Sequence, residues 1–549
     1  MKLNRPALDR HAATWVVGVL YGLFLVAPIG FFLFGKAGLK SLSVDRYVAS
    51  DLARTVGFTV FQASLSSIAS VLLALPGAYL VSHVRFPLRR FVQSVSLVPF
   101  VLPSIIVIIC MISFYGNSGV LSRLLNLKIR LIYNFSGILI AHVFYNYAIA
   151  LRIIGEGWSR ISPRYSETAM SLGDSKAGIF FRITLRLLRP TILSALILIF
   201  IYCFMSFGIV LVFGGIRFST LEVRAYQEMF IKLNYGNAAL FAVVQLLISV
   251  FFFYLVSRFI TKGQAARRNT SPISLVKFQA LSAQARITTS IYWVFVGVFL
   301  IGPLISMIMR SVVSGGELSG LAYRSLFVPG SSSRDVRALI RSDVPTVIFT
   351  SVGIALASGS ITFVSAFGLS LALKGRRNNT LRSFVMLPMA ISMVTLSIGL
   401  RVFYGNVLSF KVLVIIGQFF LAFPLVFRLT DNVVGSMNVS IIETARSLGA
   451  AGFNLIRTVY FPILRRGLAN AYAFAVAITF ADFTIVINVG RGQIATFPVA
   501  IYRLIGFRSF DLALALSSMY IVICLGLFLI IDYSSMGKGE IIEGLITNG

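Results

Sequence analysis

Charged residues are scarce in this sequence. Asp, Glu, Lys and Arg make up 12% of its 549 residues, against about 25% in a typical soluble domain. Hydrophobic residues make up 57%. A chain with this composition has too little polar surface for a water-soluble globular protein, so we expect it to lie in lipid.

Acidic residues are the scarcer of the two charged kinds. Only 18 Asp and Glu stand against 49 Lys and Arg, which gives a formal net charge of +31. Nucleic-acid binding would need these basic residues clustered on one face of a soluble fold. They are instead spread over many short loops between apolar segments. The sequence therefore predicts a lipid membrane as a partner and no nucleic acid.

Cysteine and histidine are nearly absent, with three of each. Each cysteine stands inside an apolar run, which favours packing over a disulfide framework. The histidines are too far apart in the sequence to indicate a metal cluster, so no metal site is predicted. These residues are Cys110, Cys203, Cys524, His11, His83 and His142.

The sequence also lacks the phosphate-binding loop GxxxxGK[ST] of ATPases. Gly35-Lys36 is followed by Ala37, and Gly537-Lys538 is followed by Gly539. There is likewise no Ser/His/Asp set at workable positions for a hydrolase. We therefore expect no catalytic residues and no bound cofactor in this chain, and any ATP would be hydrolysed by a separate subunit.

Long apolar runs dominate what is present. About twelve segments have the length and composition of membrane spans, which predicts an all-α polytopic membrane protein. The first run follows MKLNRPALDRH and shows no small-residue cleavage site, so it is interpreted as a span and not a secretion signal. The predicted spans are 13–34, 56–82, 92–115, 134–154, 191–213, 238–257, 288–309, 346–373, 383–404, 410–428, 467–489 and 512–533.

Basic loops indicate the orientation. Residues 83–90, 374–377 and the linker 257–287 are rich in Lys and Arg, which places them in the cytoplasm by the positive-inside rule. An even number of spans then places both termini in the cytoplasm. The polar linker divides the chain into a first half at 1–260, a linker at 261–287 and a second half at 288–549.

The two halves repeat one another. Glu167-Thr-Ala-Met-Ser-Leu-Gly173 recurs 276 residues later as Glu443-Thr-Ala-Arg-Ser-Leu-Gly449. Phe114-Tyr-Gly-Asn117 recurs 289 residues later, which indicates a longer outer loop in the first half. Two homologous six-helix halves that enclose a central path are typical of transporters.

The repeated segment has the local chemistry of a helix, a glycine turn and a second helix. Ser162 and Pro163 suit the start of a helix, and Gly173 suits a left-handed stop. A helical hairpin of this kind, within 156–190 and again within 431–466, could be bound by a cytoplasmic partner. The alternative is a plain surface hairpin in which Glu443 only completes a capping box with Ser440.

These residues resemble the coupling loop of permease subunits of binding-protein-dependent ABC importers, with the pattern EAA, three residues, G, nine residues, I, x, LP. The departures are Thr168 and Thr444 in place of the first alanine, and Arg186 in place of proline. The residues at the positions of this pattern are Glu167, Thr168, Ala169, Gly173, Ile183 and Leu185, then Glu443, Thr444, Ala445, Gly449, Val459, Phe461 and Pro462.

The resemblance implies several partners. Each loop would insert into a groove on an ABC ATPase subunit, present in two copies, which carries the ATP. An external, periplasmic or extracellular, binding protein would deliver a small-molecule substrate. The location implied is the bacterial cytoplasmic (inner) membrane.

Fused double-length permeases of this family resemble the chain over nearly its full length, and they serve thiamine and ferric iron importers. Segments 137–146, 206–215 and 496–511 look most like the thiamine type, and Thr220 to Tyr226 is shared with the iron type. The implied substrate is thiamine, with ferric iron as the alternative.

Charged residues inside spans are costly and therefore candidates for function. Arg152, Arg401 and Asp482 qualify, and Asp482 stands out because both substrates are cationic. A buried Asp that only bonds neighbouring helices is the equal alternative. Aromatic side chains could stack on a thiazolium cation; the candidates are Tyr145, Phe207 and Phe483.

A secondary transporter driven by an ion gradient is the competing class. It would need proton-titrating carboxylates within the spans, of which Asp482 is the clear example, and it would leave the paired loops without a use.

Overall fold

The computed structural model describes residues 10–35, 38–41, 46–86, 89, 102–126, 132–265, 276–314, 317–328, 336–374, 379–490 and 492–535. The chain divides by its internal contacts into two compact units. The first-loop unit is Leu42–Glu317 and holds the first copy of the repeated segment. The second-loop unit is Met1–Ser41 with Leu318–Gly549 and holds the second copy.

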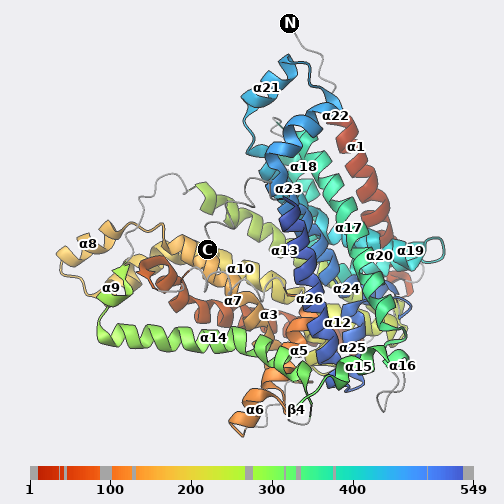
Figure 1. Cartoon of the computed structure of the whole chain (residues 1–549), viewed down its shortest axis with the longest axis horizontal. Coiled ribbons are helices and arrows are strands. Elements are labelled where there is room, and N and C mark those ends of the chain that lie inside the picture. The colour runs from red at the N-terminus through yellow and green to blue at the C-terminus, as the bar shows by residue number, and fades with distance from the viewer. Residues whose placement is uncertain are drawn as a thin grey trace. The chain divides into compact units, whose positions relative to one another are not determined.

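The first-loop unit is built almost wholly of helices (Figure 1). A parallel pair of two-residue strands joins β1 to β2. The elements are α3 (Arg46–His83), β1 (Val84–Arg85), α5 (Ser104–Tyr115), α6 (Val120–Leu124), α7 (Phe135–Trp158), α8 (Pro163–Ser171), α9 (Lys176–Ile179), the π-helical turn η3 (Phe180–Thr184), α10 (Leu185–Phe204), α11 (Gly208–Gly214), α12 (Leu221–Phe230), α13 (Tyr235–Ala265), β2 (Val276–Lys277), η4 (Phe278–Ala280), α14 (Ala283–Val312) and β3 (Val313–Ser314).

The second-loop unit is also helical. Its elements are α1 (Arg10–Tyr21), the π-helical turn η1 (Gly22–Val26), α2 (Ala27–Phe34), η2 (Leu39–Ser41), α15 (Leu321–Phe327), α16 (Val336–Ile340), α17 (Val344–Leu373), α18 (Asn379–Val385), η5 (Leu387–Ala390), α19 (Met393–Tyr404), α20 (Phe410–Gly435), α21 (Val439–Ser447), α22 (Gly452–Leu455), the π-helical turn η6 (Ile456–Tyr460), α23 (Phe461–Ala481), α24 (Thr484–Gly490), α25 (Phe497–Gly506) and α26 (Phe510–Ser535). The short strand β4 (Glu317–Leu318) pairs with β3.

The all-α polytopic class is confirmed. Within the described residues, nine helices are long and apolar enough to cross a membrane, or ten if the pair Gly452–Ala481 and Thr484–Gly490, bent by 49°, is one span. Three further apolar helices are shorter. The predicted span 383–404 contains α19, which is one of these shorter apolar helices. The start of the predicted span 92–115 lies outside the described residues.

Two predicted spans are broken and not continuous. The span predicted at 191–213 ends as α10 at Phe204, and α11 starts again at Gly208. The span predicted at 467–489 breaks in the same way between Ala481 and Thr484. Hydropathy averaged over a span does not distinguish these cases, because each break is only two or three residues long and contains one polar residue, Ser206 or Asp482.

The duplication holds at the level of single elements. Every element from α8 to α12 starts and ends 276 residues before its counterpart between α21 and α25, apart from one extra residue at the end of α23. A tertiary hydrogen bond recurs with it. Leu221 N donates to Thr59 Oγ1 at 3.0 Å, and Phe497 N donates to Ser351 Oγ at 2.9 Å.

Each unit includes the first helices of the other sequence half. In the first-loop unit, α14 packs on α5, where Ser113 Oγ and Ser306 Oγ lie 2.8 Å apart. In the second-loop unit, α2 packs on α19, and the hydroxyl of Tyr21 donates to Val385 O at 2.9 Å. The compact units therefore differ from the halves 1–260 and 288–549 at these helices.

The repeated segments lie at the ends of their units. In Figure 1, α8 and α9 are at one end of the first-loop unit and α5 and α6 are towards the other. In the second-loop unit, α21 and α22 are at one end, and α15 and α16 are at the other. Each segment is thus presented at a tip where a partner can reach it.

Candidate functional site

The first repeated segment is a helix closed by a left-handed glycine. Helix α8 begins at Pro163 after the N-cap Ser162, as predicted. Gly173 has φ +83°. Asp174 N donates to Ala169 O at 3.0 Å across the turn, a closure typical of helices that end on a left-handed residue.

The second segment repeats this closure. Gly449 has φ +88°, and Ala450 N donates to Ala445 O at 2.9 Å. The start of the helix differs from the capping-box interpretation, which is wrong. The N-cap is Asn438, whose side chain accepts a hydrogen bond from Ser440 N at 3.1 Å, so Ser440 already lies inside α21.

The two loops share a further hydrogen bond and several exposed positions. Ser171 Oγ donates to Glu167 O and Ser447 Oγ donates to Glu443 O, each at 3.0 Å. The acidic and threonine side chains of both motifs are exposed. Leu172 and Leu448, just before the glycines, are 82% and 84% exposed. The same leucine is thus exposed at the same position of both loops.

The second loop is anchored to its unit by an apolar cluster. Val434, Met437 and Ile442 pack with Leu455, Tyr460, Leu464 and Leu468, and Ala445 lies against them. Lys374, at the end of α17, donates from Nζ to Val434 O at 2.9 Å and to Met437 O at 3.3 Å. Burial lowers the pKa of the Lys374 ammonium from that of a free lysine.

The first loop is anchored mainly by rings. Trp158, the last residue of α7, lies 5.3 Å from Tyr79 and 6.2 Å from Phe180 between ring centroids. The ring of His83 stacks on Tyr79 at 4.8 Å. After the glycine turn, Arg182 Nη2 pairs with Asp174 Oδ1 at 2.8 Å on the exposed side.

Asp482 lies in the break of the second broken span. Its Oδ1 accepts from Ile485 N at 3.1 Å, which satisfies the start of α24. Its Oδ2 accepts from Gln418 Nε2 at 3.2 Å, and the side chain is 7% exposed. At the break in the other unit, Gln62 Nε2 donates to Cys203 O at 2.9 Å.

Of the predicted aromatic residues, Phe207 and Phe483 are buried and Tyr145 is half-buried. Phe207 lies 5.4 Å from Tyr226 and Phe483 lies 5.3 Å from Tyr502, which is one ring pair repeated in both units. Tyr145, in the first-loop unit, donates from its hydroxyl to Leu102 O at 3.1 Å. Phe483 follows Asp482 directly in the second-loop unit, so these two share one break.

The two arginines predicted inside spans, Arg152 and Arg401, lie within helices and not in a break as Asp482 does. Arg152 is exposed and pairs with Glu156 at 3.2 Å on the same face of α7. Arg401 donates from Nη1 to Val489 O at 2.7 Å and lies over the Phe410 ring.

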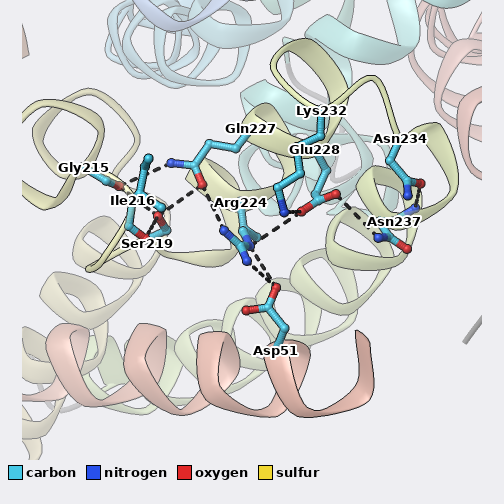
Figure 2. Close-up of polar contacts among 10 residues, drawn as sticks. All are labelled: Asp51, Gly215, Ile216, Ser219, Arg224, Gln227, Glu228, Lys232, Asn234 and Asn237. Carbon is cyan, nitrogen blue, oxygen red and sulfur yellow. Dashed lines mark hydrogen bonds and ion pairs between the residues drawn. The ribbon is translucent and has the colours of Figure 1, made fainter. Parts of the chain in front are cut away.

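Helix α12 carries a buried ionic network that the sequence analysis missed. Residues 214–237 lie between two predicted spans, yet eight of the ten residues of α12 are buried. Figure 2 shows Arg224 between Asp51 of α3 and Glu228, with Nε 3.0 Å from Asp51 Oδ2 and 3.7 Å from Glu228 Oε1. Lys232 Nζ lies 2.6 Å from the same Glu228 oxygen. The spacing of Arg224, Glu228 and Lys232 by four residues was the available signal.

The network belongs to one unit only. At the corresponding positions α25 has Ala500 in place of Arg224 and Leu504 in place of Glu228. Its Arg503 instead donates to the carbonyls of Ile340 and Gly492. The repeat is therefore close in backbone and unequal in charge at this helix.

The part of the chain that the structure describes contains no group of three or more His, Cys, Asp or Glu that could hold a metal ion.

Sequence relatives cover most of the chain. The thiamine transport system permease protein ThiP of Brucella suis is 25% identical over 98% of this chain and 98% of its own length. The protein of the same name from Escherichia coli is 26% identical over 88% of this chain and 89% of its own. The ferric transport system permease protein FbpB of Actinobacillus pleuropneumoniae is 21% identical over 88% of this chain and 71% of its own.

The family match is itself double. The family described as binding-protein-dependent transport system inner membrane component matches residues 66–269 and again residues 364–536. Each match includes one repeated segment and one broken span. The chain belongs to this family of inner membrane permeases, in a fused form that carries the family domain twice.

Proposed function

We propose that this protein is the permease subunit of an ATP-driven importer and moves thiamine across the bacterial cytoplasmic membrane. Its substrate arrives from an external binding protein. Two permease halves, 1–260 and 288–549, joined by the cytoplasmic linker 261–287, form the path, and both termini lie in the cytoplasm.

The observation that carries the proposal is the pair of matched tips. A docking surface that is used twice must be the same shape twice, and the two loops agree in their helix bounds, glycine conformation and closing hydrogen bonds. We assign Glu167, Thr168, Ala169 and Gly173, with their counterparts Glu443, Thr444, Ala445 and Gly449, to contacts with two copies of an ATPase subunit.

A separate ATPase is part of the proposal because the sequence has no phosphate-binding loop. ATP binding would close the two ATPase copies and move the loops together. The broken spans are the elements best suited to respond, since each is already interrupted between its two helices.

The substrate is proposed from the relatives and from the charge of Asp482. Proteins named for thiamine transport match the chain over nearly its whole length, whereas the ferric permease matches with lower identity. Asp482 places a carboxylate in a broken span, where it would favour a cation. Tyr145, Phe207 and Phe483 would line the same path.

The test is uptake into proteoliposomes that contain this chain, the ATPase and the binding protein. Labelled thiamine and labelled ferric iron are compared with ATP, without ATP, and with an imposed proton gradient alone. ATP-dependent thiamine uptake is expected. Iron uptake would rule out thiamine as the substrate and leave the proposed role of the coupling loops unchanged. Uptake driven by the gradient alone would favour a secondary transporter.

A further inference from the structure

Lys374 occupies the entrance to the second loop. Helix α20 ends at Gly435, and the chain then turns through Asn438 into α21. The last carbonyls of a helix lack partners within the helix and carry its negative end. Lys374 Nζ donates to two carbonyls at this turn, those of Val434 and Met437, at 2.9 and 3.3 Å.

The same ammonium also contacts the exit of the loop. Lys374 Nζ lies 5.2 Å from the centroid of the Tyr460 ring, within the range of cation–π contacts. Tyr460 ends the π-helical turn η6 that follows α22. One side chain from the end of α17 thus joins the segment that enters the loop to the segment that leaves it.

The first loop is held by contacts of another kind. Trp158 stands 276 residues before Val434, and it packs against Tyr79, His83 and Phe180 through ring contacts of 5.3 to 6.2 Å between centroids. Ring packing supplies apolar contact, whereas the Lys374 ammonium holds two carbonyls through charge-assisted hydrogen bonds, which are stronger than neutral ones.

We propose that Lys374 is a positioning residue that transmits the movement of the second loop to α17 and α20. The inference rests on the proposed function, in which the loops dock an ATPase. It adds that the two loops transmit unequally. Among the described residues, Lys374 ties the second loop to α17 through two carbonyls, whereas Trp158 holds the first loop through ring contacts.

The apolar cluster explains why this role can be separated from folding. Val434, Met437 and Ile442 are buried together beside Lys374 and keep the loop attached without it. Apolar packing is not directional. In Lys374→Met, the loop should stay folded and bind the ATPase, while its movement should no longer be passed on with the same geometry.

The experiment uses the complete transporter in proteoliposomes and measures substrate transported per ATP hydrolysed. A photo-cross-linking amino acid at Leu172 or Leu448, the exposed tips, reports docking of each loop. Lys374→Met removes both charge-assisted hydrogen bonds. It is expected to lower the transport ratio by about tenfold or more, since the loss of one such bond already corresponds to about tenfold. Cross-linking at both tips and the rate of ATP hydrolysis should equal those of the unmodified protein. Lys374→Arg should retain most of the transport ratio.

Lys411→Met is the matched control, since Lys411 is an exposed lysine near the other end of α20. A normal ratio in Lys374→Met would overturn the inference. Loss of cross-linking at Leu448 would also overturn it, because Lys374 would then only shape the docking surface. If Lys374→Met does not accumulate, Lys374→Gln takes its place, with the same outcomes deciding.

A different outcome would contradict the proposed function itself. If neither tip cross-links the ATPase in the unmodified protein, the loops are not docking sites, whatever Lys374 does.

Discussion

Gln418 donates a hydrogen bond from Nε2 to Asp482 Oδ2 at 3.2 Å, and the same amide nitrogen donates to Thr479 O at 3.0 Å. Ser358 Oγ in turn donates to Gln418 Oε1 at 2.8 Å. The carboxylate is therefore held by an amide that is itself held on both sides. At the place of Gln418 the first half has His142, and at the place of Asp482 it has Ser206.

Replacing Asp482 with Asn removes the charge, and it also places an amide nitrogen opposite Gln418 Nε2, which is itself a donor. The Asn oxygen can still accept from Ile485 N, so α24 keeps its start. Uptake of a cationic substrate should fall about tenfold, because one unit charge close to the path is worth at least about 1.4 kcal/mol at low effective dielectric. Initial uptake rates with unchanged ATP hydrolysis are the measurement. Wild-type uptake would leave Asp482 with a structural role only.

Gly449→Val tests the left-handed turn of the second loop. Nothing lies within 4 Å of an added Cβ, so the cost comes from φ +88° and not from a clash. A β-branched residue there should cost about 2 kcal/mol or shift the turn. Transport per ATP should fall several-fold.

The control is Gly435→Ala, where an added Cβ also meets nothing within 4 Å and the backbone is helical. Coupling that survives Gly449→Val as well as it survives Gly435→Ala would count against the docking role of this turn.

Gly77→Ala tests the anchoring of α14 on the first-loop unit. An added Cβ would lie 2.5 Å from the hydroxyl of Tyr292 and 2.8 Å from that of Tyr147. These hydroxyls lie 2.9 Å from each other, and Tyr292 donates to Leu73 O at 2.9 Å. Displacing them should lower the free energy of unfolding by about 2 to 3 kcal/mol.

Thermal unfolding in detergent measures this loss. Gly155→Ala is the comparison, since its added Cβ would meet only ordinary contacts, the nearest at 3.7 Å. Equal melting temperatures for the two variants would show that the two tyrosines move aside without lowering the free energy of unfolding.

The lowered pKa of Lys374 predicts a pH dependence. The ammonium is charged below its pKa and neutral above it, so its bonds to Val434 O and Met437 O weaken as pH rises. Because burial brings this pKa below that of a free lysine, transport per ATP should fall at a lower pH than free lysine would require. In Lys374→Arg the guanidinium stays charged, and the ratio should hold to higher pH. Identical profiles in the two proteins would refute the prediction.

The local features of both loops could be predicted from the sequence. Pro163 at the start of α8, and Gly173 and Gly449 in left-handed conformations, follow from the conformational limits of single residues. The bounds of α21 could not be set as well, because Ser440 and Asn438 are both good caps and the choice depends on where α20 ends.

The sequence by itself determined that this protein is helical, membrane-embedded and duplicated. Apolar length and the recurrence of residues at a constant spacing are properties that need no three-dimensional partner. Only the tertiary structure decided where spans break, that α12 is buried with its Arg224 network, and that Lys374 ties the second loop to α17 and α20. These depend on pairs of residues tens to hundreds of positions apart, such as Asp51 with Arg224 and Lys374 with Val434, which come together only when the helices pack.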